Sequence, residues 1–167
     1  HPGDDLPVTR VGPGDLAYLQ TSSGTTGNQR CIPTTHRMLL KQLASYARRM
    51  ELTSGDVILN WMPLHHDGGL LLGAILPFVC AVPVVLMSPL DWVRHPAMLF
   101  KAIDTYRGTL CTMPNFAFSH LVRRVRERDV EGISLSSMRA FMNGSERVYH
   151  TSFDRFLERF APLGVMT

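Results

Sequence analysis

Short apolar runs alternate along this chain with longer segments in which apolar residues recur at a helical spacing. The short runs predict strands at residues 16–21, 57–62, 84–87, 109–113 and 138–142. The longer segments predict helices at residues 35–50, 69–80, 96–106, 115–128 and 151–160. Such alternation is typical of an α/β fold, so we expect a mostly parallel sheet of about five strands with helices on both faces.

Four turns rich in glycine or polar residues come directly after predicted strands. They are residues 22–27, 65–69, 114–116 and 143–146. Ligands of parallel α/β sheets bind beyond the carboxyl ends of the strands. We therefore expect the four turns to lie together on one edge of the sheet and to form a binding site there.

The first of these turns has the composition of a phosphate-binding loop. Residues 21–30 read TSSGTTGNQR and contain five hydroxyl side chains, two glycines and Arg30. Glycine lets backbone amides approach an anion, hydroxyl groups donate hydrogen bonds, and arginine neutralises charge. Neither the Walker spacing nor the GxGxxG pattern fits these residues. An ordinary solvated turn is the alternative interpretation.

The second turn, within the segment WMPLHHDGGL at residues 61–70, offers two histidines and a carboxylate. A metal site is disfavoured, because adjacent residues of an extended loop point in different directions and no third ligand follows at a suitable spacing. Capping of the next helix by Asp67, with the histidines as partly buried loop residues, stays open beside a role in substrate binding.

Composition and charge restrict the other possibilities. The chain is 45% hydrophobic and 19% charged with a net charge of +3, as in ordinary globular proteins, and nothing in this balance calls for nucleic acid. The densest basic patch contains Arg123, Arg124, Arg126 and Arg128 and alternates with Val125, Glu127 and Asp129. On a helix this pattern favours a solvated face over a polyanion site.

Two further features bear on the compartment. Cys31, Cys80 and Cys111 show no disulfide or metal spacing, which fits a reducing, cytoplasmic environment. Residues 68–87 carry no charge over a length that could span a membrane. Because Pro77 and Pro83 interrupt them, we expect a helix and a buried strand and no transmembrane segment.

Several of these segments together resemble the adenylate-forming enzymes, the superfamily of acyl-CoA synthetases, peptide-synthetase adenylation domains and luciferases. Residues 22–31 are similar to its TSGSTGxPKG signature, with Arg30 at the lysine and Gln29 and Cys31 at the proline and glycine. Residues 63–70, PLHHDGGL, resemble the PLYHDMGL of fatty-acyl-AMP ligases. The segments at 83–89, 113–118, 135–139 and 143–146 resemble PVVLMSP, PNFAY, LSSWR and NGAEP of that branch.

The resemblance implies a role for each part of the site. The phosphates of ATP would bind to Ser22, Ser23, Gly24, Thr25, Thr26 and Gly27, with Arg30 as a catalytic cation. His66 would lie near the substrate carboxylate, and the turn of Gly144, Ser145 and Glu146 would contact adenine. The acyl pocket would include His65, Asp67, Gly68, Gly69, Gly73, Asn115 and Phe116, where glycines leave room for an acyl chain.

By the same resemblance, a carboxylate oxygen attacks the α-phosphate of ATP and forms an acyl-adenylate. Positioning and charge stabilisation, shared with Mg²⁺, would supply the catalysis. The acyl group would then pass to the thiol of a carrier protein or of coenzyme A. The acid would be a fatty acid or another carboxylic acid.

The resemblance also implies that the chain is only part of such an enzyme. We expect residues 1–14 to be a leader or linker, and residues 15–167 to be the central AMP-binding subdomain of a larger ligase, inactive alone. Two alternatives are a non-catalytic nucleotide- or acyl-binding module and a synthetase adenylation domain for a different carboxylate. An unrelated small kinase is disfavoured because the Walker lysine and paired acids are missing.

Overall fold

The computed structural model describes residues 10–21 and 31–165. The chain divides between Glu51 and Leu52 into two compact units, and each is described here by itself.

The first unit contains a β-hairpin and a helix. Strand β1, Leu16–Thr21, pairs antiparallel with β2, Cys31–Thr35, so that Thr21 lies opposite Cys31. Helix α1, His36–Arg49, begins after Thr35, whose hydroxyl oxygen accepts a hydrogen bond from the Met38 amide at 3.3 Å. The expectation that β1 belongs to the parallel sheet is wrong. Its partner β2 was not predicted, because proline in a five-residue run argues against a strand.

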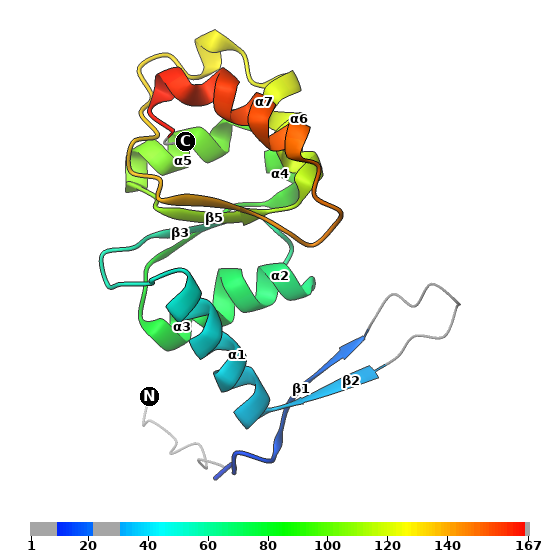
Figure 1. Cartoon of the computed structure of the whole chain (residues 1–167). Helices are drawn as coiled ribbons and strands as arrows, with labels where there is room; N and C mark the ends of the chain where they lie inside the picture. The colour runs from blue at the N-terminus through cyan, green and yellow to red at the C-terminus, as the bar shows by residue number, and fades with distance from the viewer. Residues whose placement is uncertain (1–9, 22–30, 166–167) are drawn as a thin grey trace, which may run out of the picture. The chain divides into compact units, whose positions relative to one another are not determined.

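The second unit is built on a four-stranded parallel sheet. The strands are β3 (Ile58–Asn60), β4 (Val84–Leu86), β5 (Leu110–Met113) and β6 (Ala140–Asn143), in the order β4-β3-β5-β6. Figure 1 shows helices α4 to α7 on one face of this sheet and α2 and α3 on the other. The predicted α/β architecture is therefore confirmed, with four strands in the parallel sheet.

The helices follow the predicted segments closely, except that the helix beginning at Asn115 ends at Arg124, four residues before its predicted end, because Val125 is extended. They are α2 (Asp67–Leu70), a π-helical turn (Leu71–Ile75), α3 (Leu76–Cys80), α4 (Pro89–Arg94), α5 (Ala97–Tyr106), α6 (Asn115–Arg124) and α7 (His150–Phe160). Two short 3-10 helices lie at Glu127–Asp129 and Ala161–Leu163. The prediction missed α4, because six residues are too few to show a helical period.

The charge-free segment at residues 68–87 forms most of one interrupted helix and all of β4. The expectation of a buried strand is wrong, because β4 is at the edge of the sheet and its residues are half-buried or exposed. Within the described part of the chain, no helix is both long enough and apolar enough to cross a bilayer.

Aromatic side chains fill the core between the sheet and α5 to α7. Phe156 of α7 is completely buried and contacts Phe118 and Phe141 edge-on, with ring centroids 5.2 and 5.0 Å apart. The next residue of the same helical stripe, Phe160, packs edge-on against Phe100 at 4.7 Å. Edge-to-face pairs add attraction to the burial of apolar area, so the sequence-predicted stripe of α7 anchors this layer.

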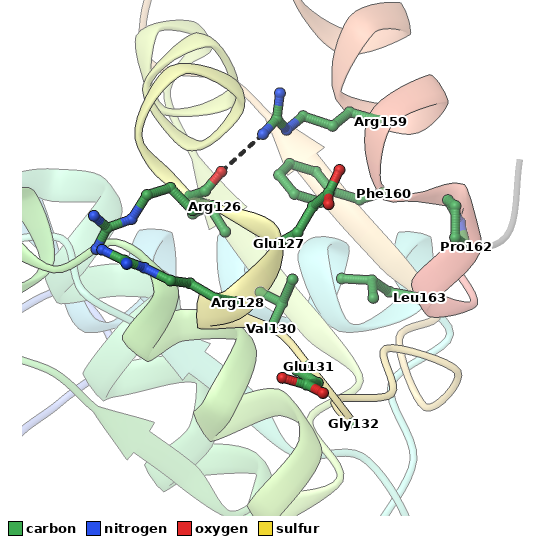
Figure 2. Close-up of a pocket in the computed structure, with 11 residues that line it drawn as sticks. Arg126, Glu127, Arg128, Val130, Glu131, Gly132, Arg159, Phe160, Pro162 and Leu163 are labelled. Carbon is green, nitrogen blue, oxygen red and sulfur yellow. Dashed lines mark hydrogen bonds between the residues drawn. The ribbon is translucent and has the colours of Figure 1, made fainter.

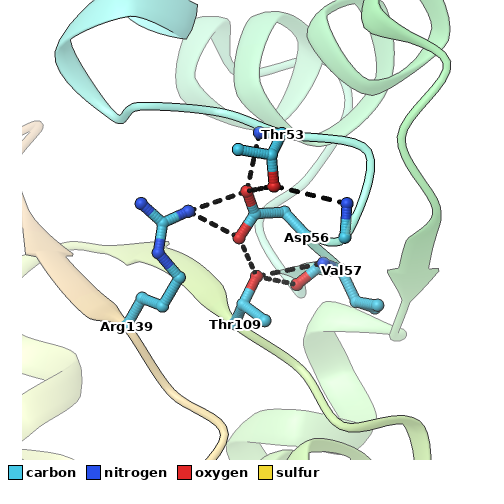
Figure 3. A network of polar contacts seen from close by, with 6 residues as sticks. Thr53, Asp56, Val57, Thr109 and Arg139 are labelled. Carbon is cyan, nitrogen blue, oxygen red and sulfur yellow. Dashed lines mark hydrogen bonds and ion pairs between the residues drawn. The ribbon is translucent and has the colours of Figure 1, made fainter.

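A buried carboxylate ties together the amino ends of three strands (Figure 3). Asp56, which precedes β3, is 1% exposed, and both of its carboxylate oxygens lie 2.7 Å from Arg139 Nη1, just before β6. Thr109, just before β5, donates a hydrogen bond to Asp56 at 2.7 Å. Burial by itself raises the pKa of Asp56, but hydrogen bonds from Arg139, Thr53 and Thr109 outweigh it and hold that pKa below its ordinary value.

Candidate functional site

Three of the four predicted site turns follow strands of the parallel sheet. They connect β3 to α2, β5 to α6 and β6 to α7. Because the strands are parallel, these turns lie on one edge of the sheet, called here the carboxyl edge. β3 and β5 are neighbours whose following helices cover opposite faces (Figure 1). Such a divergence of connections is where α/β sheets bind ligands.

The turn after β3 presents two polar side chains at the start of α2. His66 is the helix cap, since its Nδ1 atom accepts a hydrogen bond from the Gly68 amide at 3.1 Å. Asp67 accepts from the same amide at 2.7 Å, and its carboxylate lies 2.8 Å from His66 Nδ1. The capping position is therefore occupied by His66 and not by Asp67. Both side chains are about half exposed and accessible to a ligand, and His65 beside them is exposed as well.

Two of the predicted site segments meet at Gly68. A Cβ atom on Gly68 would lie 3.2 Å from Met62 Cε and 3.4 Å from Ser145 Oγ. The start of α2 therefore lies against the turn that follows β6. In this way the fold brings a residue predicted for the acyl pocket beside one predicted for adenine.

Gly69 and Gly73 serve close packing. A Cβ atom on Gly69 would overlap the carbonyl oxygen of Pro63, and one on Gly73 would overlap the side-chain amide of Asn60. Asn60 is buried and exchanges hydrogen bonds with the backbone of Met62, 3.1 Å in each direction. The expectation that these two absent side chains leave room for an acyl chain is wrong, because the chain's own atoms fill that space. Their membership of an acyl pocket stays a prediction.

Asn115 joins the start of α6 to the turn after β6. Its side chain is 6% exposed, and Oδ1 accepts hydrogen bonds from Asn143 Nδ2 at 3.1 Å and from the Tyr149 amide at 3.0 Å. Nδ2 donates to Ser152 Oγ at 3.3 Å. Asn115 thus fixes both ends of the turn that contains the predicted adenine contacts.

The turn after β6 is also held by Glu146, and open space lies beside its backbone at Gly144. Glu146 accepts a hydrogen bond from the Phe116 amide at 2.6 Å, so its carboxylate is engaged with the start of α6. Ser145 has a φ of +69°, a left-handed conformation that is strained for residues other than glycine and is common at ligand sites. A Cβ atom on Gly144 would meet no described atom within 4 Å. The backbone of this turn therefore borders open space.

Beneath these turns lies an aromatic cluster. Trp61, which follows β3, stacks on Trp92 of α4 with ring centroids 3.6 Å apart, and Phe116 contacts both edge-on at 6.0 and 6.4 Å. Both indoles are buried, and neither Nε1 atom has a partner among the described residues. They are the only two tryptophans of the chain. Sequence reasoning missed Trp92 because its short helix was not predicted.

The predicted phosphate loop cannot be located in the same way. Ser22 to Gly27 and Arg30 lie outside the described residues, between β1 and β2 of the hairpin. Strand β1 is not part of the parallel sheet, so the sheet gives no reason to expect this loop on the carboxyl edge. Its phosphate-binding role stays a prediction.

Residues 10–21 and 31–165 contain no group of three or more His, Cys, Asp or Glu side chains that could hold a metal ion. Complete burial raises the pKa of the Cys111 thiol to about 12, which leaves it protonated and unreactive near neutral pH.

Comparison with known proteins identifies relatives of the whole chain. Residues 2–166 match the family of AMP-binding enzymes. The long-chain-fatty-acid–AMP ligase FadD26 of Mycobacterium bovis is 34% identical over 151 residues, which cover 87% of this chain and 26% of that protein.

Solved structures agree with this match. The fatty acyl-adenylate ligase of L. pneumophila, determined in complex with acyl adenylate and pyrophosphate, superposes with a TM-score of 0.91 and 31% identity over 95% of this chain. An adenylation domain of a keto acid-selecting peptide-synthetase module, bound to a keto acyl adenylate, gives 0.86 and 28% over 94%. The chain spans about a quarter of each relative, 26% of the mycobacterial protein and 28% of each solved chain.

Proposed function

Because the chain belongs to the AMP-binding enzyme family, we propose that it is the nucleotide- and carboxylate-binding part of an acid-activating ligase. The parent enzyme would use ATP to convert a carboxylic acid, most simply a fatty acid, into an acyl-adenylate. The observation that carries this proposal is the convergence of the turns at Gly68, Asn115 and Ser145 on the carboxyl edge. Residues 15–167 would form the central subdomain.

Each turn then has a distinct task. The backbone of Gly144, Ser145 and Glu146 would receive adenine, since open space lies beside Gly144 and both ends of the turn are fixed. His66 would orient the substrate carboxylate. It suits this task because its ring is half exposed while its Nδ1 atom is held at the start of α2. An exposed edge of Phe116 above the stacked indoles would contact the acyl group.

Charge on the transferring phosphates would be neutralised by Arg30 and the hydroxyl side chains of residues 22–27, together with Mg²⁺. The described residues offer no cluster of carboxylates for this ion. That suits a magnesium ion carried by the ATP phosphates, because Mg²⁺ in such sites keeps several waters and takes few protein ligands. The acyl group would pass to a carrier-protein or coenzyme A thiol.

The identity of the acid has two candidates with separate support. A fatty acid agrees with the name of the mycobacterial relative, which matches at 34% identity. A keto or amino acid selected by a modular synthetase agrees with the likeness to a keto acid-selecting adenylation domain. Residues 63–70, PLHHDGGL, resemble the PLYHDMGL of fatty-acyl-AMP ligases, so we favour the fatty acid.

A titration of the chain with a non-hydrolysable fatty acyl-sulfamoyl adenosine tests the proposal. Both tryptophans lie beneath the candidate site, so we expect saturable quenching of their fluorescence, and no saturable change with the guanosine analogue. The variant Arg30→Gln should weaken ATP binding and leave the mimic unaffected, because the mimic has no β- or γ-phosphate. Arg37→Gln, on the exposed face of α1, is the matched control.

If neither fluorescence nor calorimetry detects binding of the mimic, the proposed function is wrong. A separate assay addresses the division of labour with the rest of the parent enzyme. The chain alone, incubated with ATP, a fatty acid and hydroxylamine, should form no acyl-hydroxamate. Clear turnover would overturn the view that catalysis needs further segments.

A further inference from the structure

The arginines at the end of α6 line a hollow together with cations from α4 and α5. Arg123 and Arg124 form the end of α6, Arg94 ends α4, and Lys101 lies in α5. Together with Arg126 they surround a hollow of about 620 Å³. The sequence pattern alone favoured a solvated helix face, but the fold gathers the cations of three helices around one concavity.

Most of these cations have no anionic partner. The one carboxylate of the hollow, Asp129, pairs with Arg126 at 3.0 Å. The side chains of Arg94, Lys101, Arg123 and Arg124 are exposed and make no hydrogen bond or ion pair with any residue that the structure describes. Five cations against one carboxylate give the lining a net charge of +4, compared with +3 for the whole chain. A concave surface lined by one sign of charge concentrates ions of the opposite sign.

We propose that this cationic hollow binds a small molecule that carries two or more phosphate groups. Four of its five cations are arginines, whose planar guanidinium groups match phosphate oxygens in pairs. Its volume lies in the range of about 300–1,000 Å³ that is usual for small-molecule sites. The lining contains no Phe, Tyr or Trp on which the bases of a nucleic acid could stack, and no exposed large apolar residue that could enter a membrane.

A neighbouring hollow shows that the excess of positive charge is local. It shares Arg126, has a volume of about 670 Å³, and is walled by Val130, Phe160 and Leu163 (Figure 2). Glu127 and Glu131 offset two of its three arginines, so its lining has a net charge of +1, and Arg159 donates a hydrogen bond to the Val125 carbonyl oxygen at 2.9 Å. An anion therefore has reason to prefer the first hollow.

The cationic hollow is distinct from the carboxyl edge. Helix α6 is ten residues long, begins with Asn115 at that edge and ends with Arg124 in the hollow. At 1.5 Å per residue, the two sites lie at opposite ends of a helix about 15 Å long. A ligand in the hollow would not occupy the proposed adenylate site.

Calorimetric titration of the full chain with sodium tripolyphosphate tests the proposal. The measurement is made in an Arg30→Gln background, so that the predicted phosphate loop contributes little. We expect the added change R123Q/R124Q to weaken binding at least tenfold. The control R48Q/R49Q, which removes the same charge from the exposed last turn of α1, should leave binding unchanged. Unchanged fluorescence and unfolding midpoint would verify that the variants are folded.

If R123Q/R124Q binds tripolyphosphate as tightly as its parent, the proposal is wrong. It is also wrong if R48Q/R49Q loses as much affinity as R123Q/R124Q, because that result indicates non-specific attraction between charges. Sedimentation with phosphatidylglycerol vesicles and titration with polyglutamate identify the other sources of negative charge. If either binds through Arg123 and Arg124 while tripolyphosphate does not, the small-molecule proposal is wrong. Binding of the acyl-adenylate mimic should be the same in R123Q/R124Q and R48Q/R49Q as in their common Arg30→Gln parent, so the outcome is independent of the proposed function.

Discussion

Replacing Asn115 with alanine should loosen the turn that we assign to adenine. The substitution removes the oxygen that accepts hydrogen bonds from Asn143 Nδ2 and the Tyr149 amide. Asn143 is only partly exposed, so its amide loses a partner that water replaces poorly, at a cost of about 1–3 kcal/mol. Tyr149 is 52% exposed, so water can replace its partner at little cost. We therefore expect the free energy of unfolding to fall by about 2 kcal/mol.

Asn115→Asp is the matched control. A carboxylate keeps the acceptor for both donors, and the cost of burying its charge at this 6% exposed position is partly offset by the favourable position of a negative charge in the first turn of α6, so Asn115→Asp should lose less stability than Asn115→Ala. Urea unfolding followed by tryptophan fluorescence reports on the correct unit, because Trp61 and Trp92 both lie in the unit that contains Asn115. If the proposed function is correct, Asn115→Ala should also weaken binding of the acyl-adenylate mimic about tenfold, whereas Asn115→Asp should bind it about as tightly as the wild type.

Two outcomes would refute this reasoning. In the first, the alanine variant unfolds within about 0.5 kcal/mol of the wild type, the range expected for a surface change. In the second, alanine and aspartate lose the same stability, which would mean that the hydrogen bonds accepted by Asn115 do not hold the turn.

Three further predictions concern packing, pH and reactivity. Gly73→Ala should destabilise the chain by about 1–3 kcal/mol in urea unfolding, because its methyl group has no space, whereas Gly144→Ala should leave stability unchanged and weaken binding of the adenylate mimic. Because the pKa of Asp56 is lowered by folding, its stabilisation is present above about pH 4 and is lost as pH falls through the folded-state pKa. The stability difference between wild type and Asp56→Asn should therefore shrink below pH 4, and a constant difference would contradict this assignment. Iodoacetamide at pH 8 should modify exposed Cys31 and spare Cys111, as judged by mass spectrometry; equal labelling would show that Cys111 is accessible.

Local patterns predicted most of the second unit. The apolar runs at β3 to β6 and the stripes of α5 to α7 were visible because burial on one side imposes a period on the sequence. Helix α4 and strand β2 were missed, since six residues show too little of a period and Pro33 argues against a strand. The pairing of β1 could not be predicted, because an apolar run does not identify its partner.

The site was predicted as a set of residues and not as an arrangement. His66, Gly68 and Ser145 were selected from separate motifs, and the parallel sheet placed their turns on one edge. The same motifs suggested that Gly69 and Gly73 leave room for a ligand, yet Pro63 and Asn60 fill that space. A sequence shows where a glycine lies, but it does not show which atoms occupy the space that a side chain would fill.

The sequence by itself determined the fold class, the positions of the turns and the family, because periodicity and motif spacing are local properties of the chain. Only the tertiary structure decided which turns share an edge, that Asn115 fixes the turn after β6, and that Asp56 clamps the strands at their other end. It also gathered Arg94 and Lys101 beside the arginines of α6. These contacts join residues far apart in the chain, and their geometry depends on how helices pack on the sheet, which no local pattern encodes.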